Sequence, residues 1–487
     1  MAREGHGFKL TEKQMSPQAV TPAAFTLPVA IGTAPINLSK RLAPLAAPVN
    51  VPILAWTYDE AVAALGFSYD FKNFTLCEVI HSHFELHKQS PIVLINVLDP
   101  AQHYEEVEST VLPIIKRQVT IEAEGALINT LEVKSADGST TYIKNTDYGT
   151  AYNALGQLVI SVRPGAGIPA GATSVSVVYS KLDPSSVGAT EIIGGNDAVT
   201  GINTGLYLIE DVFPRWQLVP GYLLAPGYSD NPLVAANMVS RVASINGLFK
   251  ARAVTDLDAS VRYNEIEQWK NDNGYRDPHQ INTYPMAVRS GRTYRMSTLY
   301  VGTACTVDAA NSGVPAESAS NKRLMADGLV YSDGSEMVIG KNIADEINSA
   351  GIVTGLNFTG NFVAWGNRTA AFPDFNDPQR AFIPVRGMFD WVQNNFAVQF
   401  WSKVDGMMNP RNTGEIVDGG NFWLNGLVAS GFLLGGRIEF FESENPASDL
   451  MQGIVRFHFY ITPPGPMQEI EGIFEYDISY LNALFGA

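Results

Sequence analysis

Cysteine is scarce in this sequence: Cys77 and Cys305 are the two present in 487 residues, and they stand far apart. This usage excludes a disulfide framework and a cysteine-based zinc site, and it fits a reducing cytosol. Long apolar runs are missing too, since none approaches the roughly 20 residues that span a bilayer. The opening residues, MAREGHGFKLTEKQ, lack the apolar core of a secretion signal. We therefore expect a soluble chain made in the cytoplasm.

Positive charge is also in short supply. Lys and Arg total 33 against 49 Asp and Glu, which gives a formal net charge of -16 at pH 7. Nucleic acids and anionic membranes select surfaces rich in Lys and Arg, so we expect neither as a direct partner. The length predicts about three domains.

Catalytic signatures are incomplete wherever they begin. Residues 227–231 (GYSDN) start like a nucleophile elbow, but Asn231 stands where the second glycine belongs. A phosphate-binding loop near Gly340 has five residues between its glycines instead of four, and Asn342 replaces the required Ser or Thr. A Ser/His/Asp arrangement in the later α/β segment would depend on His279, in the loop NGYRDPHQ. We therefore predict a protein that is not an enzyme.

Three histidines, His81, His83 and His87, suggest a metal site, and His83 and His87 would share a helical face. They lack the HExxH pattern, and Cys77 is the one thiol nearby. An ordinary cluster at a helix end is the favoured interpretation. The sequence predicts no metal and no cofactor.

Hydropathy patterning divides the chain into blocks. Apolar runs such as SPIVLINVLDP (90–100), bounded by prolines, alternate with helical spacing and predict an α/β domain with a mostly parallel sheet. Alternating segments separated by turns predict a small β-sandwich or barrel inserted into it. The predicted parts are an N-terminal arm (1–20), a central α/β domain (21–110 and 186–368), the β insert (111–185), an α+β C-terminal domain (369–465) and a C-terminal arm (466–487).

The C-terminal arm carries the strongest local signal. After the stiff spacer PPGP (463–466), the stretch EIEGIFEYDISYL places Ile470, Phe474, Tyr476, Ile478 and Tyr480 on one face and mostly acidic residues on the other. This period of two predicts a half-buried strand, which needs a sheet edge. Two edges fit: a third strand beside 437–442 and 453–462 of the same chain, or a sheet in another copy.

Rough magnitudes allow either pairing. Backbone hydrogen bonds contribute about 0.5–1.5 kcal/mol each, whereas ordering costs about 1–2 kcal/mol per residue. Burial of the large apolar side chains, at roughly 1.5–3 kcal/mol each, therefore decides whether the strand forms.

The segment 388–401 (MFDWVQNNFAVQFW) has aromatic residues at helical spacing and is predicted to be a core-facing helix within 387–404, with a second helix over 422–434. Arg386, Lys403, Arg411 and Arg437 form a mild basic cluster. They are either scattered solubilising charges or a patch that meets an acidic partner.

The stretch GGRIEFFESENPASDLMQGIVRFHFYITPPGPMQEIEGIFEYDISYL resembles the C-terminal domain of tail sheath proteins from contractile bacteriophage tails and R-type tailocins. Its strand, Asn-Pro loop, second strand, proline spacer and Glu-Tyr-Asp strand come in the family's order. The opening HGFKLTE (6–12) is similar to the family's first segment, VAIGTAP (29–35) to its first core strand, and APGYS (225–229) to a strand and loop of its central domain.

The resemblance implies a subtilisin-like central domain without a catalytic triad, and hexameric rings stacked around an inner tail tube. It also implies partners at the baseplate and tail terminator, location in a virion tail or tailocin assembled in the bacterial cytoplasm, and contraction that drives the tube through a bacterial envelope. Terminal arms would complete a sheet in neighbouring copies, and the β insert would face outward.

The resemblance assigns four sets of residues. The donated C-terminal arm comprises Ile470, Ile473, Phe474, Tyr476, Ile478 and Tyr480, and the N-terminal arm comprises Gly7, Phe8, Leu10 and Glu12. The recipient hairpin comprises Ile438, Phe440, Val455, Phe457 and Phe459, and the residues facing the tube are Arg386, Lys403 and Arg411. Two other classes stay open: a subtilisin-like hydrolase using Ser229 and His279, and a β-rich surface-layer or adhesion protein.

Overall fold

The computed structural model describes residues 27–40 and 48–485, and its body is built around one eight-stranded sheet. Six neighbouring strands are parallel, and an antiparallel strand closes each edge. In sheet order they are β2 (Ile53–Ala55), β3 (Ile92–Asn96), β1 (Leu27–Gly32), β13 (Pro220–Leu224), β14 (Arg252–Asp256), β15 (Gln280–Thr283), β19 (Ile352–Asn357) and β20 (Phe362–Trp365). Buried on both faces, β1 and β3 read as continuous apolar runs, as predicted.

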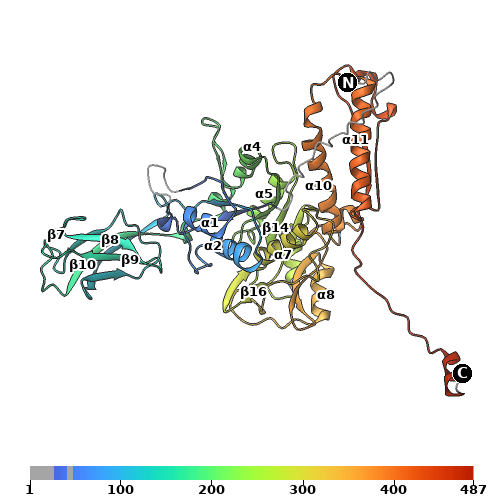
Figure 1. The fold of residues 1–487 in the computed structure, drawn as a ribbon. Coiled ribbons are helices and arrows are strands. Elements are labelled where there is room, and N and C mark those ends of the chain that lie inside the picture. Colours follow the sequence, from blue (N-terminus) through green and yellow to red (C-terminus); the bar gives the residue numbers. More distant parts are fainter. Residues whose placement is uncertain (1–26, 41–47, 486–487) are drawn as a thin grey trace, which may run out of the picture.

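Helices surround this sheet (Figure 1). They are α1 (Tyr58–Leu65), α2 (Thr75–Ile80) continued by the π-helix η2 (His81–Leu86), α3 (Ala189–Ile193), α4 (Val212–Trp216), α5 (Pro232–Val242), α6 (Ile266–Asp272), α7 (Met296–Ala310) and α8 (Lys341–Ser349). A side sheet of β17 (Arg292–Arg295), β16 (Met286–Arg289) and β18 (Gly328–Val330) and the short hairpin β11–β12 (Gly195–Asn196 and Asn203–Thr204) complete the body.

The inserted β segment has a core of its own and projects from the body (Figure 1). Its two antiparallel sheets are β4 (Tyr104–Pro113), β10 (Ser174–Leu182), β6 (Glu132–Ser135) and β7 (Thr141–Tyr142), and β5 (Gln118–Ile121), β9 (Leu158–Val162) and β8 (Tyr148–Tyr152). The predicted boundary at residue 111 is wrong. The insert begins with β4, because Tyr104 already pairs with Leu182 at the end of β10.

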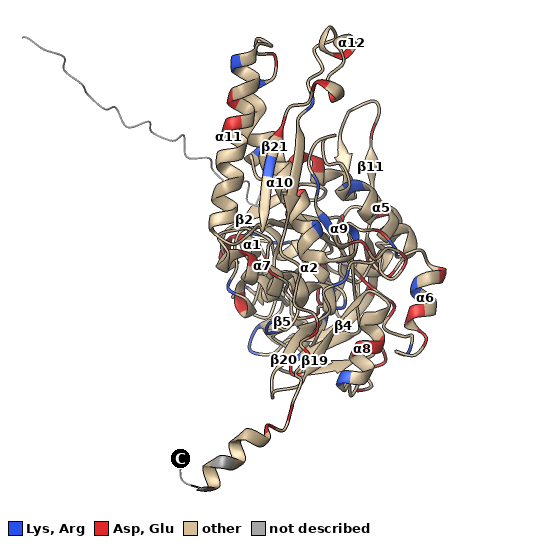
Figure 2. Ribbon diagram, turned by 90° about the vertical axis from the view of Figure 1, so that its right-hand side faces the viewer, with Lys and Arg blue, Asp and Glu red and all other residues tan. Residues whose placement is uncertain are grey.

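The C-terminal module is a pair of long helices with a β-hairpin against them. The short α9 (Pro378–Ala381) leads into α10 (Ile383–Phe400) and α11 (Pro410–Ala429), and the hairpin comprises β21 (Gly435–Glu439) and β22 (His458–Thr462). Met388, Trp391, Leu424 and Ile438 form the centre of its core. Figure 2 shows β21 beside α11, with charged residues of both signs spread over the module.

Two helices depart from the sequence prediction. The second C-terminal helix begins at Pro410, not at 422, because Asn409 caps it by accepting a hydrogen bond from the N–H of Asn412 at 2.9 Å and Pro410 takes the first helical position. Gly414, Gly419 and Gly420 lie in this first part of α11, where their low helix propensity weakens the local signal. Helix α7 was not predicted, because it is buried nearly all round and so carries no amphipathic period.

Candidate assembly interface

The C-terminal arm leaves the body as an extended segment without a strand partner (Figure 1). Pro463 is buried, and the residues from there to Asp477 are in no helix or strand; the short 3-10 helix η7 (Ile478–Phe485) follows. The predicted strand over 470–480 is therefore absent from the single chain, and pairing as a third strand of the chain's own hairpin is contradicted. A strand needs a sheet edge, and the described arm residues pair with none in the single chain.

The apolar side chains of the arm are consequently exposed to solvent. Phe474 is 98% exposed and Ile473 is 88% exposed, and the other predicted arm residues are as open. These are Ile470, Tyr476, Ile478 and Tyr480. A soluble chain does not keep so many large apolar groups in water along one segment without a partner to bury them. The predicted N-terminal arm, with Gly7, Phe8, Leu10 and Glu12, lies outside the described residues.

The base of the arm is fixed to the body. Arg368 donates a hydrogen bond from Nη2 to Oε1 of Gln468 at 2.8 Å. Its guanidinium stacks on the rings of Phe372 and Phe382, at 4.5 and 3.9 Å from their centroids. Freedom of the arm therefore starts after Gln468.

The hairpin presents one apolar and one polar face. On the inner face Ile438 is buried opposite Phe459, whose ring meets that of Phe396 on α10 at 4.6 Å between centroids. On the outer face the guanidinium of Arg437 lies 3.9 Å from the ring centroid of Tyr460 and pairs with Glu439. An added strand with one apolar and one acidic face would match both sides.

Three predicted hairpin residues lie outside the strands. Phe440, Val455 and Phe457 belong to the connection between β21 and β22, where the rings of Phe440 and Phe457 stand 5.6 Å apart. The strands are shorter than predicted because, beyond their ends, the side chain of Asn445 takes the place of backbone hydrogen bonds between the two strands. The carboxamide of Asn445 donates to the carbonyl oxygens of Phe441 and Arg456 and accepts from the N–H of Arg456 at 2.7 Å.

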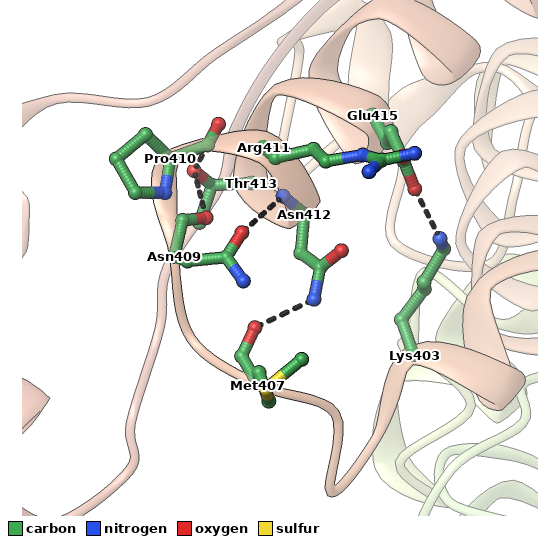
Figure 3. A network of polar contacts seen from close by, with 8 residues as sticks. All are labelled: Lys403, Met407, Asn409, Pro410, Arg411, Asn412, Thr413 and Glu415. Carbon is green, nitrogen blue, oxygen red and sulfur yellow. Dashed lines mark hydrogen bonds and ion pairs between the residues drawn. The ribbon is translucent and has the colours of Figure 1, made fainter.

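Two basic candidates flank the connection between α10 and α11 (Figure 3): Lys403, partly exposed, and Arg411, exposed in the first turn of α11. Lys403 and Arg411 both pair with Glu415, at 2.7 and 3.1 Å, and the Lys403 hydrogen bond, followed by that of Arg411, lowers the pKa of this carboxyl. Asn412 donates from Nδ2 to the carbonyl of Met407 at 2.6 Å and holds the loop against the helix. The two cations thus share one anion, and the patch is less basic than the sequence implies.

Sequence reasoning missed the apolar character of this loop. Met407 is 78% and Trp401 63% exposed, with Val404 and Met408 also open. A tryptophan and two methionines in a loop rich in Asp, Gly, Asn and Pro (WSKVDGMMNP) were the available signal.

Arg386 cannot face a partner from its position in this structure, because it is buried where α10 meets the body. It donates to Oδ1 of Asp390 at 2.8 Å, and Nε2 of His279 lies 3.3 Å from the same oxygen. Nearby, the carboxamide of Asn394 binds the N–H and C=O of Lys250, at 2.9 and 2.7 Å. Asp390, held by Arg386, and Asn394 therefore join α10 to the body of the molecule.

The charge of His279 makes this junction sensitive to pH. Burial alone would lower its pKa, but the carboxylates of Asp277 and Asp390 outweigh burial and raise the pKa to about 8 from 6.5. A raised folded-state pKa means that the stabilisation is complete below pH 6.5 and is lost as pH rises through about 8. The stabilisation of the folded state by protonated His279 amounts to about 2 kcal/mol of unfolding free energy.

We expect His279→Gln to remove about 2 kcal/mol of the difference in unfolding free energy between pH 6 and pH 9. Urea denaturation of the monomeric chain and of the variant at both pH values measures this quantity. An unchanged pH dependence in the variant would show that His279 does not titrate with folding.

The residues of the hydrolase hypothesis lie apart. Ser229 is fully buried after the C-terminal end of β13, and its Oγ accepts from the N–H of Asp256 at 2.9 Å. Asp256 ends β14 and accepts from Oγ of Thr283 at the end of β15, at 3.0 Å. His279 precedes β15 and therefore lies at the N-terminal ends of the parallel strands, whereas Ser229 and Asp256 lie at their C-terminal ends. No Ser/His/Asp arrangement is assembled from these residues.

Within residues 27–40 and 48–485, no group of three or more His, Cys, Asp or Glu is arranged to hold a metal ion. No helix in that part of the chain has the length and apolar character needed to cross a membrane.

Comparison with known proteins points to one family. No family model matches the sequence. The tail sheath protein of Burkholderia phage BcepMu is 27% identical over 496 aligned residues, which cover 99% of this chain and 98% of that protein. Over nearly its whole length the chain is therefore similar to a contractile tail sheath protein. A shorter match, 27% identity over 30% of this chain and 35% of the relative, is the major tail sheath protein of Serratia phage KSP20.

Solved structures agree at the level of the fold. The sheath complex of an extracellular contractile injection system, PVC, in its contracted state has a TM-score of 0.57 and covers 99% of both chains at 13% identity. The baseplate of the anti-feeding prophage gives 0.54 and covers 98% of this chain and 100% of that chain, also at 13% identity. The matches to tail sheath proteins support a role as a structural sheath subunit rather than as an enzyme.

Proposed function

We propose that this chain is a sheath subunit that polymerises as stacked hexameric rings around an inner tail tube, and that the C-terminal arm of one copy adds as a strand to the hairpin of the next. The observation that carries the proposal is the exposed arm. Its described residues expose large apolar groups in a single chain and pair with no strand there.

Charge supports a neighbouring copy as the acceptor. The arm's acidic face carries Glu471, Glu475 and Asp477. The outer face of the hairpin carries Arg437, which pairs with Glu439 in the single chain. An arm that aligns its acidic face with Arg437 places its apolar face on the side of Phe459 and Ile461. Opposite charges across neighbouring strands favour this orientation over the reverse. Pairing along the whole predicted strand requires η7 to extend.

The linkage defines the architecture of the polymer. An arm that always reaches to another copy makes a head-to-tail contact, which continues indefinitely as a helical tube. The N-terminal arm, through Gly7, Phe8, Leu10 and Glu12, would tie in a further neighbour. The central domain would have a subtilisin-like arrangement and the β insert, a small sandwich, would face outward.

We place the tube contact at the loop between α10 and α11. Trp401 and Met407 supply exposed apolar area, and Lys403 and Arg411 supply charge at its margin. Arg386 is excluded from this contact because it is buried. Further contacts with baseplate and terminator proteins complete the particle, which would be a virion tail or tailocin assembled in the host cytoplasm.

Contraction would draw its energy from contacts between copies that form in the contracted state. The strand-paired arms would keep neighbours joined while the bodies rotate and slide outward. The tube is then driven through a bacterial envelope.

Negative-stain microscopy of the purified protein tests the assembly. We expect striated tubes of uniform diameter. Flat lattices would instead indicate a surface-layer protein, and dispersed particles at every concentration and salt condition would contradict self-assembly by strand exchange.

A further inference from the structure

The β insert carries positive charge at its far end. The insert projects from the body (Figure 1), and β4 and β10 run side by side from Tyr104 and Leu182 at the body to Pro113 and Ser174 at the far end. Three exposed cations follow β4 and β9 at this end, and we call them the basic tip: Lys116, Arg117 and Arg163.

The turn at the tip has a geometry that its residues do not favour. Ile115 and Gln118 exchange two backbone hydrogen bonds, at 2.8 and 2.9 Å, around Lys116 and Arg117. Both central residues have positive φ, 50° and 67°. A two-residue turn of this kind selects Asn and Gly, because the Cβ of most other residues clashes with the backbone in that conformation. The chain thus keeps two cations where backbone geometry favours other residues, which is typical of a functional surface.

The two arginines of the tip are held near each other by the strand ladder. The carbonyl of Arg117 accepts from the N–H of Val162 at 2.9 Å, and Nη2 of Arg117 donates to the carbonyl of Val162 at 3.1 Å. Arg163 is the next residue, and its N–H donates to the carbonyl of Asp147 at 3.0 Å. A guanidinium has five N–H donors, so the bond to Val162 leaves most of those on Arg117 for a ligand.

Two carboxylates also lie toward this end, but each is bonded to its own loop. Asp147 accepts from the N–H of Ile143 at 2.7 Å and from that of Gly167 at 2.8 Å. Asp137 accepts from the N–H of Ser139 at 3.1 Å. These bonds hold both carboxylates within their loops and direct neither toward a cation of the tip.

Elsewhere on the insert, lysines are paired. Lys134 lies 3.2 Å from Glu132, and Lys181 lies 3.0 Å from Glu105 near the body. Among the residues that the structure describes, no carboxylate forms an ion pair with the basic tip. The charge of the tip is therefore available to a partner.

The acidic body does not cancel this charge. Strand β10 has nine residues and is about 30 Å long, at about 3.3 Å per residue. Salt screens charges beyond about 8 Å at physiological ionic strength. The net charge of -16 describes the whole chain, and the field at the tip is set by the cations there.

We propose that the basic tip binds phosphorylated polysaccharide of the kind that bacterial cell surfaces carry. Guanidinium groups bind phosphate oxygens through paired N–H donors, and Lys116 adds a point charge beside them. The inference rests on the proposed outward position of the insert. In a tube of identical copies all tips then lie at one radius, where neighbouring copies present further basic tips, so the anionic partner comes from outside the particle.

Repetition makes such a contact effective. Exposed charge pairs are individually weak, so one tip holds a polysaccharide loosely. A tube presents the same tip on every copy, and a polysaccharide repeats its phosphate groups. We therefore expect tubes to bind about 10²–10⁴-fold more tightly than the unassembled chain.

Binding of assembled tubes to immobilised lipopolysaccharide tests the partner. We expect retention that falls as salt is raised, and that is at least about tenfold weaker on the same lipopolysaccharide after removal of its phosphates. Equal retention on the two surfaces would overturn phosphate recognition. Equal or tighter retention on double-stranded DNA would overturn the polysaccharide as partner in favour of nucleic acid.

A pair of double variants tests the site. Lys116→Asn with Arg117→Gly gives the turn its preferred residues and removes two cations, so we expect unchanged tubes, a melting temperature that is no lower, and at least about tenfold weaker binding. Lys134→Gln with Lys181→Gln removes two cations that are already paired and should leave binding unchanged. Undiminished binding by the first variant, or an equal loss in the second, would refute the tip as the site.

Failure of assembly is a separate result. If no tubes form, the proposed polymer is wrong, and the unassembled full chain at high concentration then tests the tip alone. Weak binding of that chain to lipopolysaccharide, lost with Lys116→Asn and Arg117→Gly, would support the tip without the tube. Absence of binding by both the tubes and the concentrated chain would refute the proposal.

Discussion

A chain that ends at Gln468 is expected to fold and stay monomeric. Removal of residues 469–487 takes away all six predicted apolar contact residues of the arm but keeps the hydrogen bond from Arg368 that fixes its base. These six side chains are exposed in the single chain, so we expect their removal not to destabilise the fold. Each would contribute roughly 1.5–3 kcal/mol when buried in a neighbour. Microscopy and sedimentation of the truncated chain should show no tubes, with an unchanged circular dichroism spectrum.

Point variants separate the two faces of the arm. The double variant Phe474→Ser and Tyr476→Ser should weaken each junction by about 3–6 kcal/mol, which raises the concentration needed for assembly by about 10²–10⁴-fold. The matched variant Glu475→Gln and Asp477→Asn keeps the apolar face and should shift it far less, since exposed charge pairs contribute about 0–1 kcal/mol. Tubes that persist in the truncated chain would refute the arm as the linker.

Asp390→Ala is expected to destabilise the protein by about 3–5 kcal/mol. Asp390 is 0% exposed and accepts from Arg386 at 2.8 Å, with His279 at 3.3 Å. Its removal leaves a buried guanidinium without its carboxylate, which is far more costly than loss of the attraction alone. The same change also loosens α10 from the body, so the C-terminal module should open first.

The chain offers a matched control for that variant. Arg411 and Glu415 have the same spacing along a helix and lie 3.1 Å apart, but Arg411 is 86% exposed. Glu415→Ala should therefore cost about 0–1 kcal/mol. Urea denaturation of both variants compares them directly, and hydrogen exchange in α10 locates the loss. Equal effects in the two variants would show that burial does not strengthen the Arg386–Asp390 pair.

Parts of the fold were predictable where one local rule dominates. The strands β1 and β3 are continuous apolar runs between prolines, and α1 combines helical spacing with a Thr57 cap. Alternation in the arm picked out side chains that are exposed in the single chain, although the predicted strand is absent there. An alternating pattern predicts that a segment can pair as a strand. It does not indicate whether the partner strand belongs to the same chain or to another copy.

Other features depend on contacts that a single sequence does not display. The buried state of Arg386 follows from Asp390 and from His279, which is distant in the chain. Helix α11 keeps several glycines, and Gly420 is used for a close approach to Ile438 that no local pattern announces. The hydrogen bonds between the carboxamide of Asn421 and the backbone of Ile438 on β21 are likewise a tertiary contact between helix and strand.

The geometry of the insert has a consequence for engineering. Strands β4 and β10 enter and leave it side by side, with Tyr104 opposite Leu182 and the N–H of Asp183 bonded to the carbonyl of His103 at 3.0 Å. The two ends of the insert therefore lie next to each other where they join the body of the molecule. A foreign module whose termini lie equally near each other can be grafted at this junction, so that every copy in an assembled particle displays one passenger.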